Sequence, residues 1–401
     1  MNFLEQAKKI ENQIIRDRRN LHKIPELRLN LPKTSSYIRK RLDEMDISYD
    51  TLINGNSIVA YIGTYSDKCI GFRADMDGLE IKEETDLPYA SIHDGLMHAC
   101  GHDGHVATAL GACRILKDNE DKLNNLVKVF FQPGEEIPGG ARPMILEGCM
   151  DKPKVDRIIA IHQGELFGDY PKGTIAYKSG EMMASMDTFT LKIKSKGGHA
   201  ARPDSFIDPI SIISEINNGF YKIISREIDP LNPALISITQ IHGGTNQNVI
   251  PNEVFEEGTV RCFDEKTRAY LEERMNNLAT NIAKAYRAEA VFTYNRFYPS
   301  LINDEEFTYF VRDIAIDILG RENVFEVKKP SMGGDDFAFF LKEAKGTYLS
   351  LNNLKPSSDG ITYPHHSSKF DIYEDTLYIG CGLLAEVCYR YLRKDKWWIN
   401  L

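Results

Sequence analysis

MDTFTLKIKSK, residues 186–196, alternates apolar and polar side chains, which is typical of a half-buried antiparallel strand. On its N-terminal side, apolar segments such as CIGFRAD (69–75) and RIIAIHQ (157–163) alternate with helical patterns. That alternation favours an α/β fold with a mixed, mostly parallel sheet covered by helices. On its C-terminal side, the pattern becomes strand, helix, strand, strand, helix, strand, which is the order of a ferredoxin-like α+β sandwich. The quoted segment therefore marks the start of a second, smaller domain.

The second domain is predicted to be an insertion, because helix and strand patterns alternate again after about Pro299. We expect a discontinuous larger domain formed by residues 1–183 and 298–401, and an inserted domain formed by residues 184–297. At the N-terminus, apolar residues at helical spacing predict one helix over residues 3–22.

Charge and composition exclude several classes of protein. The chain has 401 residues, with 49 basic and 58 acidic side chains, so its net charge of −9 gives no field that attracts nucleic acid or an anionic membrane. The sequence has neither the pattern of a signal peptide nor an apolar run of about 18 residues. Its seven cysteines form no disulfide framework. We therefore expect a cytoplasmic protein with reduced thiols, and neither nucleic acid nor a membrane as a partner.

The densest group of reactive side chains is HACGHDGH, residues 98–105. In it Cys100 and His102 lie two residues apart, on either side of a glycine that allows a turn. A thiolate and an imidazole together suit zinc or another divalent transition metal rather than magnesium or calcium. The alternative for this stretch is a buried free cysteine among histidines at the start of a helix.

Three further stretches carry matching donors. Glu135 and Glu136 follow an apolar strand, His162 ends another, and His365 and His366 lie in a long loop. Adjacent glutamates can divide the roles of metal ligand and general base, although such a pair alone is more often a solvated turn. His162 could likewise be a core histidine. Taken together, the stretches offer sulfur, nitrogen and oxygen donors for two metal ions, and this combination indicates a metal-dependent hydrolase.

Motifs along nearly the whole chain resemble the M20 metallopeptidase superfamily. The resemblance is to its amidohydrolase branch, which includes hippurate hydrolases, auxin-conjugate amidohydrolases and N-acetyldiaminopimelate deacetylases. The motifs that carry it are LHKIPEL (21–27), FRADMDGL (72–79), MHACGHDGHVA (97–107), FQPGEE (131–136), AIHQ (160–163), GGHAARP (197–203), HGGTNQNVIP (242–251), GTVR (258–261), MGGDDFAFF (332–340) and HHSSKFDI (365–372). The resemblance implies a catalytic domain of zinc-peptidase-like topology and an inserted satellite domain through which two copies dimerise.

The resemblance also implies roles for individual residues. The implied ligands of two divalent metal ions, which can be Zn, Mn, Ni or Co, are Cys100, His102, Glu136, His162 and His366. Glu135 is implied as the general base, and Asp75 as a carboxylate that orients or tunes the metal site. From the satellite domain, His199 is implied to reach the active site of the partner subunit and stabilise the oxyanion. Asn248 and Arg261 resemble residues that hold the carboxylate of the substrate.

The sequence departs from the family pattern in two places. Asp335 replaces the usual glutamate, and we assign it no role from the sequence. Ser367, Ser368 and Lys369 occupy a loop where proline often occurs, which could alter the shape of the acyl pocket.

The expected function is hydrolysis of the amide of a small N-acyl amino acid to a carboxylic acid and an amino acid. Three alternatives stay open at this point. The substrate could be N-acetyldiaminopimelate, or the same metal centre could serve a dipeptidase or aminopeptidase. The chain could also bind metal without catalysis, but the intact ligand set argues against this alternative. The ligand set does not choose among the four metals.

Overall fold

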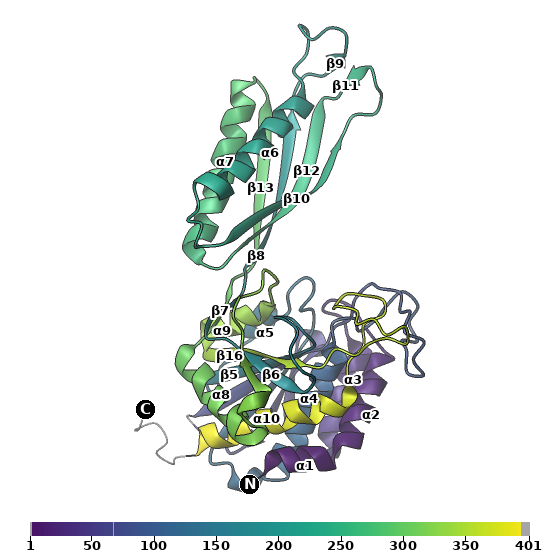
Figure 1. Cartoon of the computed structure of the whole chain (residues 1–401), viewed down its shortest axis with the longest axis vertical. Helices are drawn as coiled ribbons and strands as arrows, with labels where there is room; N and C mark the ends of the chain where they lie inside the picture. Colours follow the sequence, from purple (N-terminus) through teal and green to yellow (C-terminus); the bar gives the residue numbers. More distant parts are fainter. Residues whose placement is uncertain (1, 67, 394–401) are drawn as a thin grey trace. The chain divides into compact units, whose positions relative to one another are not determined.

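A computed structural model describes residues 2–66 and 68–393 of the chain (Figure 1). The chain forms two compact units. The first comprises Met1–Met182, Ile302–Pro330 and Asp335–Leu401, and the second comprises Met183–Leu301 and Ser331–Gly334. No helix among the described residues combines the length and the apolar character needed to cross a membrane.

The first unit is built on an eight-stranded sheet in the order β1, β2, β4, β3, β5, β16, β6, β15. These strands are β1 (Ser48–Leu52), β2 (Ser57–Gly63), β3 (Cys69–Asp75), β4 (Leu126–Gln132), β5 (Arg157–Gln163), β6 (Thr174–Tyr177), β15 (Val324–Glu326) and β16 (Lys345–Asn352). The central strands β4, β3, β5 and β16 run parallel to one another. β15 is parallel to β6, whereas β1, β2 and β6 make antiparallel pairings. The predicted mixed, mostly parallel sheet is confirmed.

Helices surround this sheet, and the residues of the central strands are almost entirely buried. The helices of the first unit are α1 (Phe3–Lys9), α2 (Glu11–His22), α3 (Pro32–Glu44), α4 (His102–Lys117), α5 (Ala141–Leu146), α8 (Glu305–Leu319), α9 (Phe340–Glu343) and α10 (Leu377–Leu392). α4 packs against α2 and α10, and all three contribute side chains to the main hydrophobic core. The single helix predicted over residues 3–22 is wrong in one respect, because Ile10 leaves the helical conformation and separates α1 from α2.

The second unit contains a four-stranded antiparallel sheet in the order β10, β12, β8, β13. Its elements are β8 (Met186–Lys194), β9 (Gly198–His199), α6 (Pro209–Arg226), β10 (Ala234–Gly243), β11 (Val249–Ile250), β12 (Glu253–Cys262), α7 (Glu265–Ala285) and β13 (Glu289–Tyr298). Every second residue of β8 is buried, as the alternation in residues 186–196 predicts. Their side chains form a separate core with α6 and α7, which confirms the ferredoxin-like order.

The borders of the two units differ slightly from the predicted domain borders. Ser331–Gly334 groups with the second unit although the sequence places it in the larger domain. The reason is backbone pairing: Ala184 N donates hydrogen bonds to Ser331 O at 3.0 Å and to Gly333 O at 2.9 Å. β7 (Gly180–Met183) and β14 (Leu301–Asn303) form a small two-stranded sheet.

A buried carboxyl group in the second unit predicts a pH-dependent stability. Glu256 on β12 is fully buried, and neither of its carboxylate oxygens has a hydrogen-bond partner among the described residues. Burial raises the pKa of Glu256 from its ordinary value of 4.5 to about 7. In the unfolded chain the group ionises near pH 4.5, whereas in the folded chain it resists ionisation, so stability is lost as the pH rises from about 4.5 to 7.

We therefore expect Glu256→Gln to raise the free energy of unfolding by about 2 kcal/mol at pH 8 and to change it little at pH 4. Glu257→Gln is the matched control, because Glu257 lies on the opposite face of the same strand. Denaturant titrations at the two pH values measure the effect. An equal change at both would show that Glu256 is not the cause.

Candidate active site

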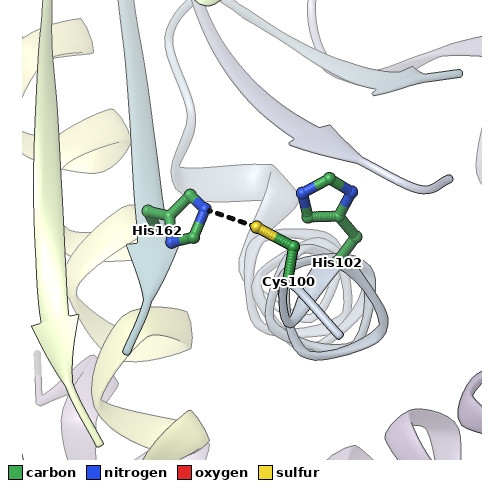
Figure 2. Close-up of side chains that lie close together, drawn as sticks. All are labelled: Cys100, His102 and His162. Carbon is green, nitrogen blue, oxygen red and sulfur yellow. Dashed lines mark hydrogen bonds between the residues drawn. The ribbon is translucent and has the colours of Figure 1, made fainter. Parts of the chain in front are cut away.

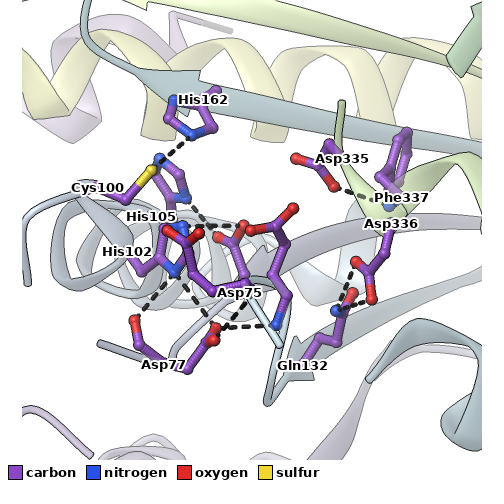
Figure 3. A network of polar contacts seen from close by, with 12 residues as sticks. Asp75, Asp77, Cys100, His102, His105, Gln132, His162, Asp335, Asp336 and Phe337 are labelled. Carbon is purple, nitrogen blue, oxygen red and sulfur yellow. Dashed lines mark hydrogen bonds and ion pairs between the residues drawn. The ribbon is translucent and has the colours of Figure 1, made fainter. Parts of the chain in front are cut away.

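The candidate site lies at one edge of the large sheet. β3 ends at Asp75, β4 ends three residues before Glu135, and His162 is the penultimate residue of β5. Because these strands are parallel neighbours, their carboxyl ends meet at the same edge, which is where α/β sheets place ligands (Figure 3). The topology thus brings together side chains that are far apart in the sequence.

One group of donors consists of Cys100, His102 and His162, whose ligand atoms all lie within 4.8 Å of one another. All three residues are buried, and Cys100 Sγ lies 3.6 Å from His162 Nε2 (Figure 2). Gly101, at φ 85°, allows the tight turn between Cys100 and the start of α4 at His102. The predicted thiolate and imidazole donors therefore converge.

The orientation of the two imidazoles suits metal binding. His102 Nδ1 donates to the carbonyl of Asp77 at 3.0 Å, and His162 Nδ1 donates to the carbonyl of Gln163 at 2.7 Å. Because His162 Nδ1 carries its proton, His162 Nε2 presents a lone pair towards Cys100 Sγ. Burial disfavours the charged form of His102, but Asp75 and Asp77 outweigh it and raise the pKa of His102 to about 10, so a bound cation would have to displace the Nε2 proton. Burial, with the nearby His105 ring, lowers the pKa of His162, which keeps it in the neutral form that binds metals.

A second group consists of Cys100, Glu136 and His366, and it shares the sulfur with the first. His366 Nε2 lies 3.0 Å from Glu136 Oε1. The backbone of His366 adopts φ 64°, which is uncommon for a residue other than glycine, and its N–H donates to the carbonyl of Ala99 at 2.8 Å. That bond ties the loop carrying His366 to the residue before Cys100. The two groups together form the arrangement expected for two cations that share one ligand.

The chemistry of these donors fits divalent transition metals. His102 Nε2 is buried without a hydrogen bond, and its nearest carboxylate oxygen, Asp75 Oδ2, is 3.5 Å away. Burial, reinforced by the charges of Glu136 and Glu135, raises the pKa of the Cys100 thiol well above its usual range. A thiolate at this position therefore needs a bound cation to offset its charge. The mixed sulfur, nitrogen and oxygen set is compatible with Zn, Mn, Ni and Co.

The pKa values of the two adjacent glutamates, Glu135 and Glu136, are shifted in opposite directions. Burial, together with the neighbouring carboxylates of Asp335 and Glu136, raises the pKa of Glu135 well above its ordinary range. Burial opposes ionisation of Glu136 too, but its contacts with His366 and His102 outweigh that effect and lower its pKa. A pair of carboxyl groups separated in this way can divide the roles of proton carrier and ligand.

Asp77, which the sequence analysis did not single out, holds this pair in place. Its Oδ1 accepts a hydrogen bond from Glu135 N at 3.0 Å, and its Oδ2 accepts one from Glu136 N at 3.1 Å. Its own carbonyl fixes His102, as described above (Figure 3). In the sequence, the only sign of this role is that Asp77 is the second aspartate of RADMD (73–77). One sequence alone does not show which of the two aspartates contacts the loop of Glu135 and Glu136.

Asp75 lies beside the site and contacts His105 Nδ1 and Arg73 Nη1, the latter at 2.6 Å. His105 Nε2 accepts a hydrogen bond from Gln163 N at 2.8 Å. With both ring nitrogens engaged, His105 supports the site and has no free atom for a metal. Asp335, the position without an assigned role, pairs with Arg73 Nη2 at 3.0 Å.

The three predicted residues of the second unit fall into two places. His199 on β9 pairs with Val249 on β11, and Ala200 N donates to Asn248 O at 3.0 Å, so His199 and Asn248 lie together. Arg261 lies elsewhere, near the C-terminal end of β12. It is eight residues after the first residue of that strand, which is about 27 Å along an extended strand. Arg261 Nη1 is buried and has no hydrogen-bond partner among the described residues.

Comparison with known proteins agrees with this geometry. The chain is 36% identical over 393 residues to thermostable carboxypeptidase 1 of Saccharolobus solfataricus, covering 97% of this chain and 98% of the relative. It is 37% identical over 391 residues to N-acetylcysteine deacetylase of Bacillus subtilis, covering 97% and 99%. Among solved structures, it superposes with a TM-score of 0.83 on the YXEP protein of Bacillus subtilis, described as a dinuclear metal binding peptidase from the M20 family. That match has 33% identity and covers 97% of this chain and 99% of the other.

The model of one protein family matches most of the chain, from residue 71 to residue 390. The matched region includes the candidate metal ligands and the whole second unit. The chain belongs to peptidase family M20/M25/M40.

Proposed function

We propose that the protein is a metal-dependent amidohydrolase that cleaves small N-acyl amino acids to a carboxylic acid and an amino acid. The observation that carries this proposal is the convergence of Cys100, His102, Glu136, His162 and His366 beside a buried Glu135 whose pKa is raised. The N-acetylcysteine deacetylase of Bacillus subtilis supports the choice of an N-acyl substrate.

In the proposed mechanism, two divalent cations at the site would polarise the amide carbonyl and make a water molecule acidic. Glu135 accepts the proton of the attacking water and then donates it to the nitrogen of the departing amino acid. Glu135 has to be ionised for the first transfer, a form that two bound cations would favour, whereas its burial favours the protonated form that it takes between the two transfers. Asp77 keeps Glu135 in reach by fixing its backbone N–H.

For the second unit, we propose that His199 stabilises the oxyanion, and that Asn248 and Arg261 bind the carboxylate of the substrate. A buried Nη1 without a hydrogen-bond partner among the described residues supports the role of Arg261, since its planar fork matches a carboxylate. We further propose that the units are a catalytic and a satellite domain, that the protein is a cytoplasmic homodimer, and that His199 acts on the partner subunit.

A second candidate is a peptidase that uses the same metal centre, and the name of the carboxypeptidase from Saccharolobus solfataricus favours it. An N-acyl amino acid and a peptide cut at its last bond share one chemical feature, an amide whose leaving amine carries a free carboxylate. The two kinds of substrate therefore differ only in the group on the acyl side of the amide. Within the first candidate, N-acetyldiaminopimelate is the alternative substrate.

Matched substrate pairs separate the two candidates. An N-acetyl amino acid and the glycyl dipeptide of the same amino acid differ only by an ammonium group on the carbon next to the acyl carbonyl. We expect kcat/KM for the N-acetyl compound to be higher by about tenfold or more, because an acyl pocket without a partner for the ammonium rejects it. A panel of N-acetyl, N-benzoyl and glycyl compounds, with N-acetyldiaminopimelate, measures this. Preference for the glycyl compounds would favour the peptidase.

A further inference from the structure

Arg18 on α2 is a fully buried arginine outside the candidate ligand set. Its Nε donates to Asp103 Oδ2 at 2.7 Å, and its Nη2 donates to Asp371 Oδ1 at 3.0 Å. Its Nη1 lies 3.0 Å from Tyr89 Oη and 3.3 Å from Glu374 Oε1. The guanidinium therefore joins several segments of the first unit.

Two of these partners belong to the segments that carry candidate metal ligands. Asp103 directly follows His102 in the first turn of α4. Asp371 lies five residues after His366, in the same loop. The ion pairs of Arg18 thus connect the segment of Cys100 and His102 to the segment of His366.

His22, one turn further along α2, strengthens the first of these connections. Its Nδ1 lies 2.8 Å from Asp103 Oδ2, and its Nε2 lies 3.2 Å from Glu83 Oε1. α2 therefore holds Asp103 with two side chains, both fully buried. In so buried a place the carboxylate of Asp103 depends on these two side chains, because an unpaired buried charge is strongly unfavourable.

We propose that Arg18 is a positioning residue that sets the spacing between the two ligand segments of the metal centre. This inference rests on the proposed function, since it assumes that the centre binds metal. Arg18 touches no candidate ligand side chain in the structure; it acts through Asp103 and Asp371. A planar fork with fixed donor directions can hold two carboxylates at a defined separation, which the single ammonium group of a lysine cannot do.

The neighbouring Arg19 supplies a matched control. Its guanidinium also pairs with Glu374, at 2.6 Å, but its side chain is 46% exposed and it contacts neither Asp103 nor Asp371. Arg18→Lys and Arg19→Lys therefore make the same chemical change at adjacent positions, and only the first alters the connection between the ligand segments. Asp371→Asn removes the charge at the other end of the connection while nearly preserving shape, so it weakens the pairing with Arg18 and also that with Lys355.

The experiment measures the affinity of the full-length, metal-free protein for Co²⁺ by competition with a chelator, and the absorption bands of the bound ion. Circular dichroism of the metal-free variants shows whether they are folded. We expect Arg18→Lys and Asp371→Asn to weaken Co²⁺ binding about 10- to 100-fold and to shift the absorption bands, whereas Arg19→Lys changes affinity less than about twofold.

Wild-type affinity and unchanged spectra in a folded Arg18→Lys protein would overturn the inference. If the Arg18→Lys protein does not fold, the Asp371→Asn protein decides the question. Wild-type affinity of that variant for Co²⁺ would equally overturn the inference. A wild-type protein that binds no Co²⁺ would instead contradict the proposed function, so the two failures are distinguishable.

Discussion

Glu135→Gln is expected to lower kcat by about 10²- to 10⁴-fold while leaving the bound metal unchanged. The amide of glutamine is nearly the same shape as the carboxyl group, but it cannot accept the proton of water or deliver it to the leaving amine. Because the contact that fixes Glu135 is made by its backbone N–H to Asp77, the substitution leaves that contact in place. Steady-state kinetics and elemental analysis of the same preparation measure both quantities.

The adjacent residue is the informative comparison for this variant. Glu136→Gln removes a candidate ligand beside His366 and should lose metal as well as turnover. Only a general base at position 135 and a ligand at position 136 produce this contrast. Turnover of Glu135→Gln at the wild-type rate would contradict the mechanism.

Cys100→Ala is expected to lose most of the bound metal and, with it, all measurable turnover. The sulfur is common to both groups of donors, so its removal weakens the binding of either cation. Metal content after dialysis, together with kcat on an N-acyl amino acid, tests this expectation.

Cys113→Ala is the control for this second variant. Cys113 is also a buried cysteine, on the same helix α4, but it belongs to none of the donor groups among the described residues. The control should retain metal and turnover. Full metal content in Cys100→Ala would show that the sulfur is not a ligand.

Local sequence patterns predict the fold well where the physical cause is itself local. The alternation in residues 186–196 is the direct consequence of a strand with one buried face, and β8 has that face. Apolar segments predict the central strands because such strands are buried on both sides. Helical spacing does not detect a break of one residue, so the interruption at Ile10 was missed. The grouping of Ser331–Gly334 was missed because it depends on a long-range pairing with Ala184.

In the candidate site, too, the sequence predicts residues that stand in short motifs and misses residues whose role depends on long-range contacts. Cys100, His102, Glu136, His162 and His366 carry rare chemistry in short motifs, and the structure brings them together. Asp77 and Arg18 were missed because aspartate and arginine are common, and their importance lies in what they contact across the fold. Arg18 and Asp371 are 353 positions apart in the chain, and no pattern in one sequence connects them.

Metal dependence of amide hydrolysis is the most direct test of the whole account. The full-length protein would be stripped with a chelator, reloaded separately with Zn²⁺, Mn²⁺, Ni²⁺ or Co²⁺, and assayed on N-acetyl and N-benzoyl amino acids with metal content measured in parallel. We expect no turnover in the stripped protein and restored release of the free amino acid with at least one metal. Bound metal without hydrolysis of any acyl amino acid, or hydrolysis that persists in the stripped protein, would contradict it.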